Sequence, residues 1–205
     1  LTIPSYPPLW TKPAAALANP DEDIPINDFC AKSLLDYEGE LVFITSRDCK
    51  DLSPEDAKAY ILGYTVGNDV SCRMFQLPKN QAGQFFFSKA FDKFAPIGPS
   101  LLSPKLFADG TAFEVITEVN GQVRQRADFK KDMIFSPEKI LSHMSQGWLF
   151  ERSSSSIMQD NSYIRNRHHH SCWHGGHDGH ARWCWSIYEA KDISERRRRG
   201  GNQDA

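Results

Sequence analysis

Three acidic side chains are spaced in a way that suits binding of a divalent cation. Glu38 and Glu40 lie just before the apolar residues 41–44, and Asp69 follows a second apolar segment. Successive side chains of a β-strand point to opposite faces, so we expect Glu38 and Glu40 on the same face. Carboxylates that share a face repel one another, and a third from Asp69 would complete the oxygen-rich pocket that hard divalent ions prefer. The alternative is a solvated strand face, with Asp69 capping a turn.

Local signals predict the elements that would position these carboxylates. The bulky and β-branched residues after Asp36 predict a strand. The sequence Ser53-Pro54-Glu55 is typical of a helix start, and we expect that helix to end at Gly63. Residues 64–66 then predict a second strand, and Asp69 follows its end.

A hairpin, a turn and an aromatic run follow. Residues 113–119 and 122–128 flank Asn120-Gly121, a pair that favours a two-residue type I′ hairpin turn. The Pro-Ile-Gly-Pro sequence at 96–99 predicts a turn, and the three phenylalanines at 85–87 are expected in the core. Many strands, few helices and short connections predict an α+β fold dominated by β-structure.

The composition changes along the 205 residues. Residues 1–25 are rich in proline, which predicts an extended segment lying over the domain. Beyond residue 147 the chain contains a histidine triplet at 168–170 and four arginines at 196–199. We therefore expect a metal-binding domain at 1–147 and an atypical, disordered tail rich in histidine and arginine at 148–205.

The tail contains side chains that bind soft metal ions. These are Cys172, His174, His177, His180 and Cys184. Their spacings do not follow the paired pattern of a folded zinc site, so incidental chelation is favoured, with a zinc-dependent or metal-storage role as the weaker alternative. The arginines at 196–199 lack interleaved aromatic residues, so no nucleic-acid partner is expected.

The chain has no signal for a membrane or an oxidising compartment. No apolar run approaches the roughly 18 residues of a membrane span. The five cysteines are scattered and odd in number, which favours a reducing interior. We expect a cytoplasmic protein without a membrane partner, with the mitochondrion as the alternative location.

The chain resembles the fumarylacetoacetate hydrolase family over residues 4–147. The segments that carry the resemblance are 36–41, 63–73, Gln76, 89–99 and the Asn120-Gly121 hairpin. Any one of them is weak, but their order and spacing together are specific. The resemblance implies a mixed β-roll of the fumarylacetoacetase C-terminal domain type, here incomplete, and a bound Mg²⁺, Mn²⁺ or Ca²⁺ ion.

The resemblance also implies roles for six residues. Three carboxylates fall on the metal ligands of the family, and three other polar residues fall on positions that face the metal and the substrate. The ligands are Glu38, Glu40 and Asp69, and the other three are Arg73, Gln76 and Lys89. Of these, Arg73 and Lys89 are the expected catalytic residues. An arginine can grip a carboxylate with two parallel hydrogen bonds.

The implied activity is metal-dependent hydrolysis of a C–C bond in a small dioxo acid such as an acylpyruvate or fumarylacetoacetate. The ion would stabilise the negative charge that develops as the bond breaks. One alternative is an oxaloacetate decarboxylase or tautomerase of the same family. Another is a catalytically silent fragment that binds only a metal or a partner subunit. Members of the family commonly form homodimers, so that assembly is an expectation too.

Two features depart from the family pattern. Hydrolytic members have a water-activating His–Glu pair ahead of the segment that matches residues 5–13, whereas the first histidine here is His143. No Thr-Gly-Thr-Pro substrate loop follows Gly147. We interpret the change after Gly147 as a reading-frame error or a mis-spliced gene model. Translation of the other two frames should then recover that loop.

Overall fold

The computed structural model describes residues 3–80, 83–108, 113–129, 131–147, 149–150 and 184–189. The strands are β1 (Leu17–Ala18), β2 (Leu35–Asp36), β3 (Gly39–Thr45), β4 (Ile61–Asn68), β5 (Ser71–Cys72), β6 (Ala95–Leu102), β7 (Phe113–Val119), β8 (Gln122–Asp128) and β9 (Cys184–Glu189). The α-helices are α1 (Asp28–Ala31), α2 (Pro54–Ala57), α3 (Phe85–Lys89), α4 (Pro104–Ala108) and α5 (Pro137–Met144). This confirms the expected α+β class, dominated by β-structure.

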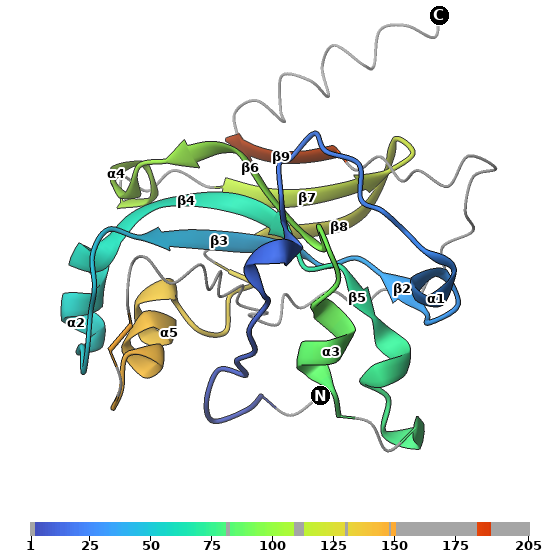
Figure 1. Cartoon of the computed structure of the whole chain (residues 1–205). Coiled ribbons are helices and arrows are strands. Elements are labelled where there is room, and N and C mark those ends of the chain that lie inside the picture. Colours follow the sequence, from blue (N-terminus) through green and yellow to red (C-terminus); the bar gives the residue numbers. More distant parts are fainter. Residues whose placement is uncertain are drawn as a thin grey trace, which may run out of the picture.

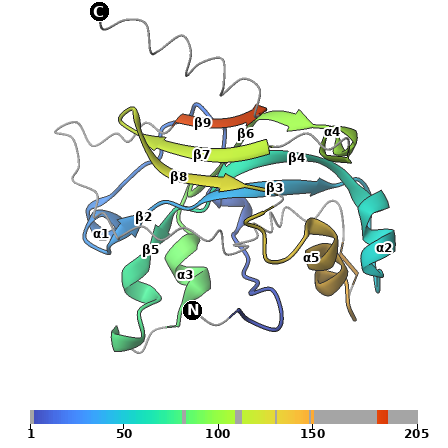
Figure 2. The same ribbon diagram turned by 180° about the vertical axis from the view of Figure 1, so that it is seen from behind.

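The described strands form two larger sheets and one short pair. The first sheet has the order β1-β6-β4-β3, in which β1 and β6 are parallel and the other pairs are antiparallel. The second has the order β8-β7-β9 and is antiparallel, and β2 pairs with β5. In Figures 1 and 2, β7, β8 and β9 lie over β3 and β4. Helices α2 and α5 lie side by side at one end, and α3 lies with β2 and β5 at the other.

Two apolar clusters meet near the end of β4. Val66 on β4 packs with Val115 on β7 and Leu141 on α5 in the larger cluster. Val70, just beyond β4, packs with Phe94 in the smaller one. Burial of these side chains fixes both ends of the segment at 67–69, which connects the two clusters.

The predicted hairpin is confirmed, and the helix after Ser53 is shorter than expected. Asn120 and Gly121 have φ angles of 52° and 74°, the left-handed values that a type I′ turn requires at both central positions. The backbone N–H of Asp56 donates to Ser53 Oγ at 3.1 Å, which confirms the helix start. Helix α2 ends at Ala57 and a 3-10 helix continues it over Lys58–Tyr60. The helical pattern does not extend to Gly63, because residues 61–68 pair with both β3 and β6 and tertiary pairing overrides it.

Two other expectations are wrong. Residues 96–99 belong to β6 instead of a turn. Pro99 lies where the pairing of β6 with β4 shifts register between Tyr64 and Val66, and Pro96 lies opposite Ala18 of the two-residue strand β1. The phenylalanines at 85–87 are 42%, 54% and 43% exposed, so they are not core residues. They lie on the short helix α3, whose buried positions are Ser88 and Lys89.

One strand lies within the segment for which a disordered tail is predicted. Strand β9 pairs with β7 from Phe113 opposite Glu189 to Glu118 opposite Cys184. The other predicted zinc-binding residues of the tail and the arginines at 196–199 lie outside the described residues. The division of the chain at residue 147 therefore stays a prediction. None of the helices in the described ranges is long and apolar enough to cross a membrane.

Candidate metal centre

The pairing of β3 with β4 brings the three predicted carboxylates together. Gly39 lies opposite Asn68, so Glu38 directly before β3 and Asp69 directly after β4 are neighbours. The backbone N–H of Asp69 donates to the carbonyl of Glu38 at 2.9 Å, which fixes that approach. One oxygen from each of Glu38, Glu40 and Asp69 lies within 4.8 Å of the others.

This carboxylate cluster is largely shielded from water. Glu40 is 2% exposed and Asp69 is 0% exposed, and the side chain of Glu38 is 11% exposed. Burial of an ionised carboxylate without compensation costs several kcal/mol. The cluster therefore requires positive charge close by.

Lys89 supplies part of that charge. It is the last residue of α3 and is 0% exposed. Its Nζ donates to Glu38 Oε2 at 3.0 Å and to Ser71 Oγ at 2.8 Å, and it forms an ion pair with Asp69 Oδ2. The ammonium of Lys89 therefore contacts two of the three carboxylates.

Lys12 supplies a second positive charge, which the sequence analysis missed. Its Nζ pairs with Asp69 Oδ1 and donates to the carbonyls of Val70 at 3.2 Å and Phe94 at 2.7 Å. A single lysine in a proline-rich segment carries no local signal for such burial. The contact depends on a separation of 57 residues along the chain, so only the folded structure shows it.

Trp10 covers the cluster from the same segment. Its Nε1 donates to Asp69 Oδ2 at 3.1 Å, and its ring stacks on Phe85 with 5.4 Å between centroids. Lys89 Nζ lies 4.9 Å from the centroid of the Trp10 ring, within the range of a cation–π contact. The predicted extended segment at 1–25 is thus part of the site.

The two lysines determine the ionisation of Asp69. Burial opposes the charged form of this carboxyl, but the ammonium groups of Lys12 and Lys89 together outweigh burial and hold the pKa of Asp69 below its ordinary value. Asp69 is therefore an anion at neutral pH.

Arg73 and Gln76 extend the site away from Asp69. Arg73 Nε donates to Asp36 Oδ2 at 2.8 Å, and Nη1 forms an ion pair with Glu38 Oε1. The same Nη1 donates to Gln76 Oε1 at 3.1 Å, and Gln76 Nε2 donates to Ser88 Oγ at 2.7 Å. The structure thus brings Arg73 and Lys89 to the cluster, and Gln76 lies one hydrogen bond further out.

The donor set fits a hard divalent cation. Glu38, Glu40 and Asp69 offer only carboxylate oxygens, which Mg²⁺, Mn²⁺ and Ca²⁺ prefer over nitrogen or sulfur donors. These residues would hold the ion that the family resemblance implies.

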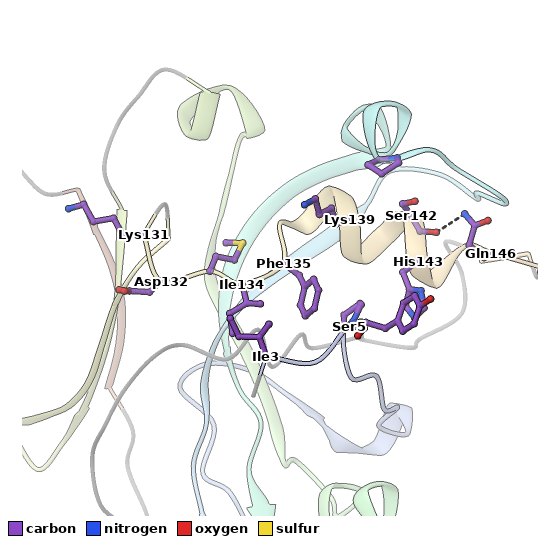
Figure 3. A pocket seen from close by; sticks show the side chains of 14 residues that line it. Ile3, Ser5, Lys131, Asp132, Ile134, Phe135, Lys139, Ser142, His143 and Gln146 are labelled. Atoms are coloured by element: carbon purple, nitrogen blue, oxygen red, sulfur yellow. Dashed lines mark hydrogen bonds between the residues drawn. The ribbon is translucent and has the colours of Figure 1, made fainter. Parts of the chain in front are cut away.

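A cavity of about 750 Å³ lies elsewhere, between the N-terminal segment and α5 (Figure 3). Its wall includes Ile3, Phe135 and His143, and the His143 ring stacks on Tyr6 with 5.5 Å between centroids. None of the three clustered carboxylates lines it. We therefore assign it no part in the metal centre.

The chain is similar in sequence to known proteins. A model of the fumarylacetoacetate (FAA) hydrolase C-terminal family matches residues 1–154. A fumarylacetoacetate hydrolase domain-containing protein 2 homolog from Dictyostelium discoideum is 38% identical over 156 residues, covering 71% of this chain and 49% of that protein. The oxaloacetate tautomerase YisK of Bacillus subtilis is 32% identical over 149 residues, covering 73% and 48% respectively.

A solved structure gives the same result for the fold. The 5-carboxymethyl-2-hydroxymuconate delta-isomerase from Mycobacterium smegmatis aligns with a TM-score of 0.61 at 33% identity, covering 73% of this chain and 56% of that chain. This chain spans about half the length of the curated relatives it matches. The family model and these relatives show that the chain belongs to the fumarylacetoacetate hydrolase family.

Proposed function

We propose that this chain moves a proton in a small 2-oxo dicarboxylic acid, with oxaloacetate as the first candidate, at a divalent-cation site formed by Glu38, Glu40 and Asp69. The observation that carries the proposal is the convergence of these three carboxylates within 4.8 Å, with Lys89 against two of them. The names of two relatives, a tautomerase and an isomerase, support this choice, because both describe rearrangements of a substrate without cleavage.

The cation and the cationic side chains have separate tasks. When bound, the divalent ion acts as a Lewis acid that lowers the free energy of an enolate at the 2-oxo group. Arg73 binds a carboxylate of the substrate. Its guanidinium has five N–H donors, and Asp36, Glu38 and Gln76 are three partners for them, so donors remain for a ligand.

Lys89 is the residue that we assign to proton transfer. Its Nζ reaches two of the three carboxylates, so a substrate held at the cluster lies within hydrogen-bond distance of it. Lys12 pairs with the other oxygen of Asp69 and donates to two backbone carbonyls, which suits a structural role. Tautomerisation requires the enolate and a proton donor, both of which this arrangement provides.

Hydrolysis of a dioxo acid such as an acylpyruvate or fumarylacetoacetate is the second candidate, and the name of the matching family favours it. It shares the enolate with tautomerisation but requires an activated water molecule in addition. Decarboxylation of oxaloacetate also passes through an enolate. A silent fragment is the remaining alternative, since the chain spans about half of its relatives.

One set of assays separates these functions. Purified protein with Mn²⁺ is given the enol form of oxaloacetate, and the decay of enol absorbance is followed together with pyruvate formation. We expect faster enol–keto exchange than without protein, and its loss in Glu40→Gln and Lys89→Met. Glu55→Gln, which changes an exposed carboxylate in the first turn of α2, is the matched control and should retain full activity.

Each other outcome identifies a different function. Pyruvate formation would indicate decarboxylation, and cleavage of acylpyruvates alone would indicate hydrolysis. Turnover that survives Glu40→Gln would refute the metal mechanism. No turnover of any of these substrates, with Mn²⁺ binding that depends on Glu40, would identify a silent fragment.

A further inference from the structure

Gln125 on β8 reaches across to the strand that carries two of the carboxylates. Its Nε2 donates to the carbonyl of Gly39 at 2.7 Å, and its Oε1 accepts from the N–H of Gly39 at 3.0 Å. Both backbone groups of one residue on β3 are therefore bonded to a single side chain from the other sheet. The two contacts join positions that are 86 residues apart in the sequence.

Strand order explains why Gly39 needs this partner. Strand β3 stands at the end of the order β1-β6-β4-β3, so among the described strands it pairs with β4 alone. Edge strands present backbone N–H and C=O groups that no neighbouring strand satisfies. A carboxamide has the same donor and acceptor as a peptide unit, so Gln125 takes the place of one residue of a neighbouring strand.

Gly39, which Gln125 holds in this way, lies between two of the proposed ligands in the sequence. The N–H of Gly39 belongs to the peptide unit that joins it to Glu38, and its carbonyl belongs to the unit that joins it to Glu40. Because peptide units are planar, holding both of them limits the rotation of the backbone at Glu38 and Glu40. On the other side, Asn68 Oδ1 accepts from the N–H of Glu38 at 3.1 Å. The backbone between the carboxylates is thus fixed from two directions.

A third hydrogen bond orients the amide of Gln125. Thr117 Oγ1 donates to Gln125 Oε1 at 3.2 Å, and Thr117 is fully buried on β7. Oε1 therefore accepts from Thr117 and from Gly39, which leaves Nε2 directed at the Gly39 carbonyl. The hairpin of β7 and β8 supplies both residues of this arrangement.

We propose that Gln125 is a positioning residue of the metal centre, which sets the distance between Glu38 and Glu40 through the backbone of Gly39. The inference rests on the proposed metal site. Residues that orient ligands commonly change metal affinity about 10- to 100-fold when they are replaced. Gln125 is not one of the three proposed ligands. Its replacement should therefore weaken binding by moving the ligands, while the number of ligands stays the same.

The test is Mn²⁺ binding to the full chain, measured by isothermal titration calorimetry together with the EPR line shape of the bound ion. Gln125→Met keeps the length of the side chain and removes the donor and the acceptor. We expect its dissociation constant for Mn²⁺ to rise about 10-fold and the line shape to change, at a temperature where urea titration shows the variant to be folded. A residue that only stabilises the fold would change neither quantity under these conditions.

Gln122→Met is the matched control, because Gln122 is an exposed glutamine of the same hairpin that bonds to Arg124 and not to β3. It should bind Mn²⁺ as the wild type does. Should Gln125→Met not fold, Gln125→Asn replaces it as the test: it keeps the amide but is one methylene too short to reach Gly39, so the same loss is expected.

The outcomes distinguish this inference from the proposed function. If a folded Gln125 variant binds Mn²⁺ within twofold of the wild type with an unchanged line shape, Gln125 is not a positioning residue and the metal site stands. If the wild type does not bind Mn²⁺, or Glu40→Gln binds it equally well, the metal site itself is refuted and this inference with it.

Discussion

Lys12 and Asp69 form an ion pair in which the two side chains are 2% and 0% exposed. The pair joins the N-terminal segment to the end of β4 and is the most buried contact of that segment with the cluster. Lys12 lies outside the two residues of β1, so the contacts of its side chain, and not strand pairing, hold the segment at this point.

Replacing Lys12 by methionine should therefore destabilise the protein strongly. Removing one partner of a buried ion pair costs about 3–5 kcal/mol when the remaining charge is uncompensated, and the lower end of this range applies here because Lys89 also contacts Asp69. We expect a loss of this size in the free energy of unfolding, measured by urea titration in the presence of a chelator. Lys32→Met is the control, because Lys32 and Asp28 form an exposed pair at 3.5 Å that contributes less than about 1 kcal/mol. Equal losses in the two variants would contradict this account of the buried pair.

The stability of the protein should also depend on Asp69 at low pH. The pKa of Asp69 is lower in the folded protein than the value of about 3.9 for an unfolded chain. The ionised form therefore stabilises the fold above about pH 4, and this contribution is lost as the pH falls from there through the folded pKa.

We expect the free energy of unfolding of the wild type to fall with pH in that acid range more steeply than that of Asp69→Asn. Acid titration of both proteins at fixed ionic strength, without divalent ions, provides the measurement. Parallel curves for the two proteins would show that Asp69 does not ionise with a lowered pKa.

Divalent cations should raise the thermal stability of the wild type. A ligand at 100 times its dissociation constant stabilises a folded protein by about 2.7 kcal/mol, which for a chain of this size raises Tm by roughly 5–10 °C. Calorimetry with Mg²⁺ or Mn²⁺ should show this shift in the wild type and little of it in Glu40→Gln. A shift that is equally large in both proteins would place the ion elsewhere, for instance on the histidines of the tail.

Lys89→Met should bind the cation more tightly than the wild type while losing turnover. The ammonium of Lys89 contacts Glu38 and Asp69, so it competes with a metal ion for the same carboxylates. A divalent ion and an ammonium about 4 Å apart repel by about 2 kcal/mol even at the dielectric constant of water, so removal of the ammonium should tighten binding about 10-fold or more. Calorimetric titration with Mn²⁺ measures this effect. Weaker binding by the variant would mean that Lys89 keeps the carboxylates in the positions that bind the ion and does not compete with it.

The parts of this structure that local sequence determines were predictable. The Asn120-Gly121 turn imposes its own geometry on the two strands beside it, and Ser53 caps its helix through a bond to a residue three positions away. Glu38, Glu40 and Asp69 could be grouped because each lies at a strand end and because the family motif contains all three.

The parts that depend on distant contacts were not predictable. The helix after Ser53 stops early because β4 has partners on both sides. Residues 96–99 form a strand because Pro96 lies opposite the short strand β1 and Pro99 lies in a shift of register. The phenylalanines at 85–87 stay half-exposed because α3 is short and buries Ser88 and Lys89 instead. Neither Lys12 nor Gln125 has a neighbour in the sequence that would reveal its partner, since each partner is more than 50 residues away.

The segment that carries Trp10 and Lys12 is joined to the main sheet by a short ladder. Among the described residues it pairs through Leu17 and Ala18, opposite Ala95 and Pro96 on β6, whereas β3 pairs with β4 over seven positions. Segments with few backbone contacts open at a smaller free energy than the sheet to which they attach. Because Trp10 and Lys12 both contact Asp69, such an opening would expose that carboxylate to solvent while the sheet stays folded.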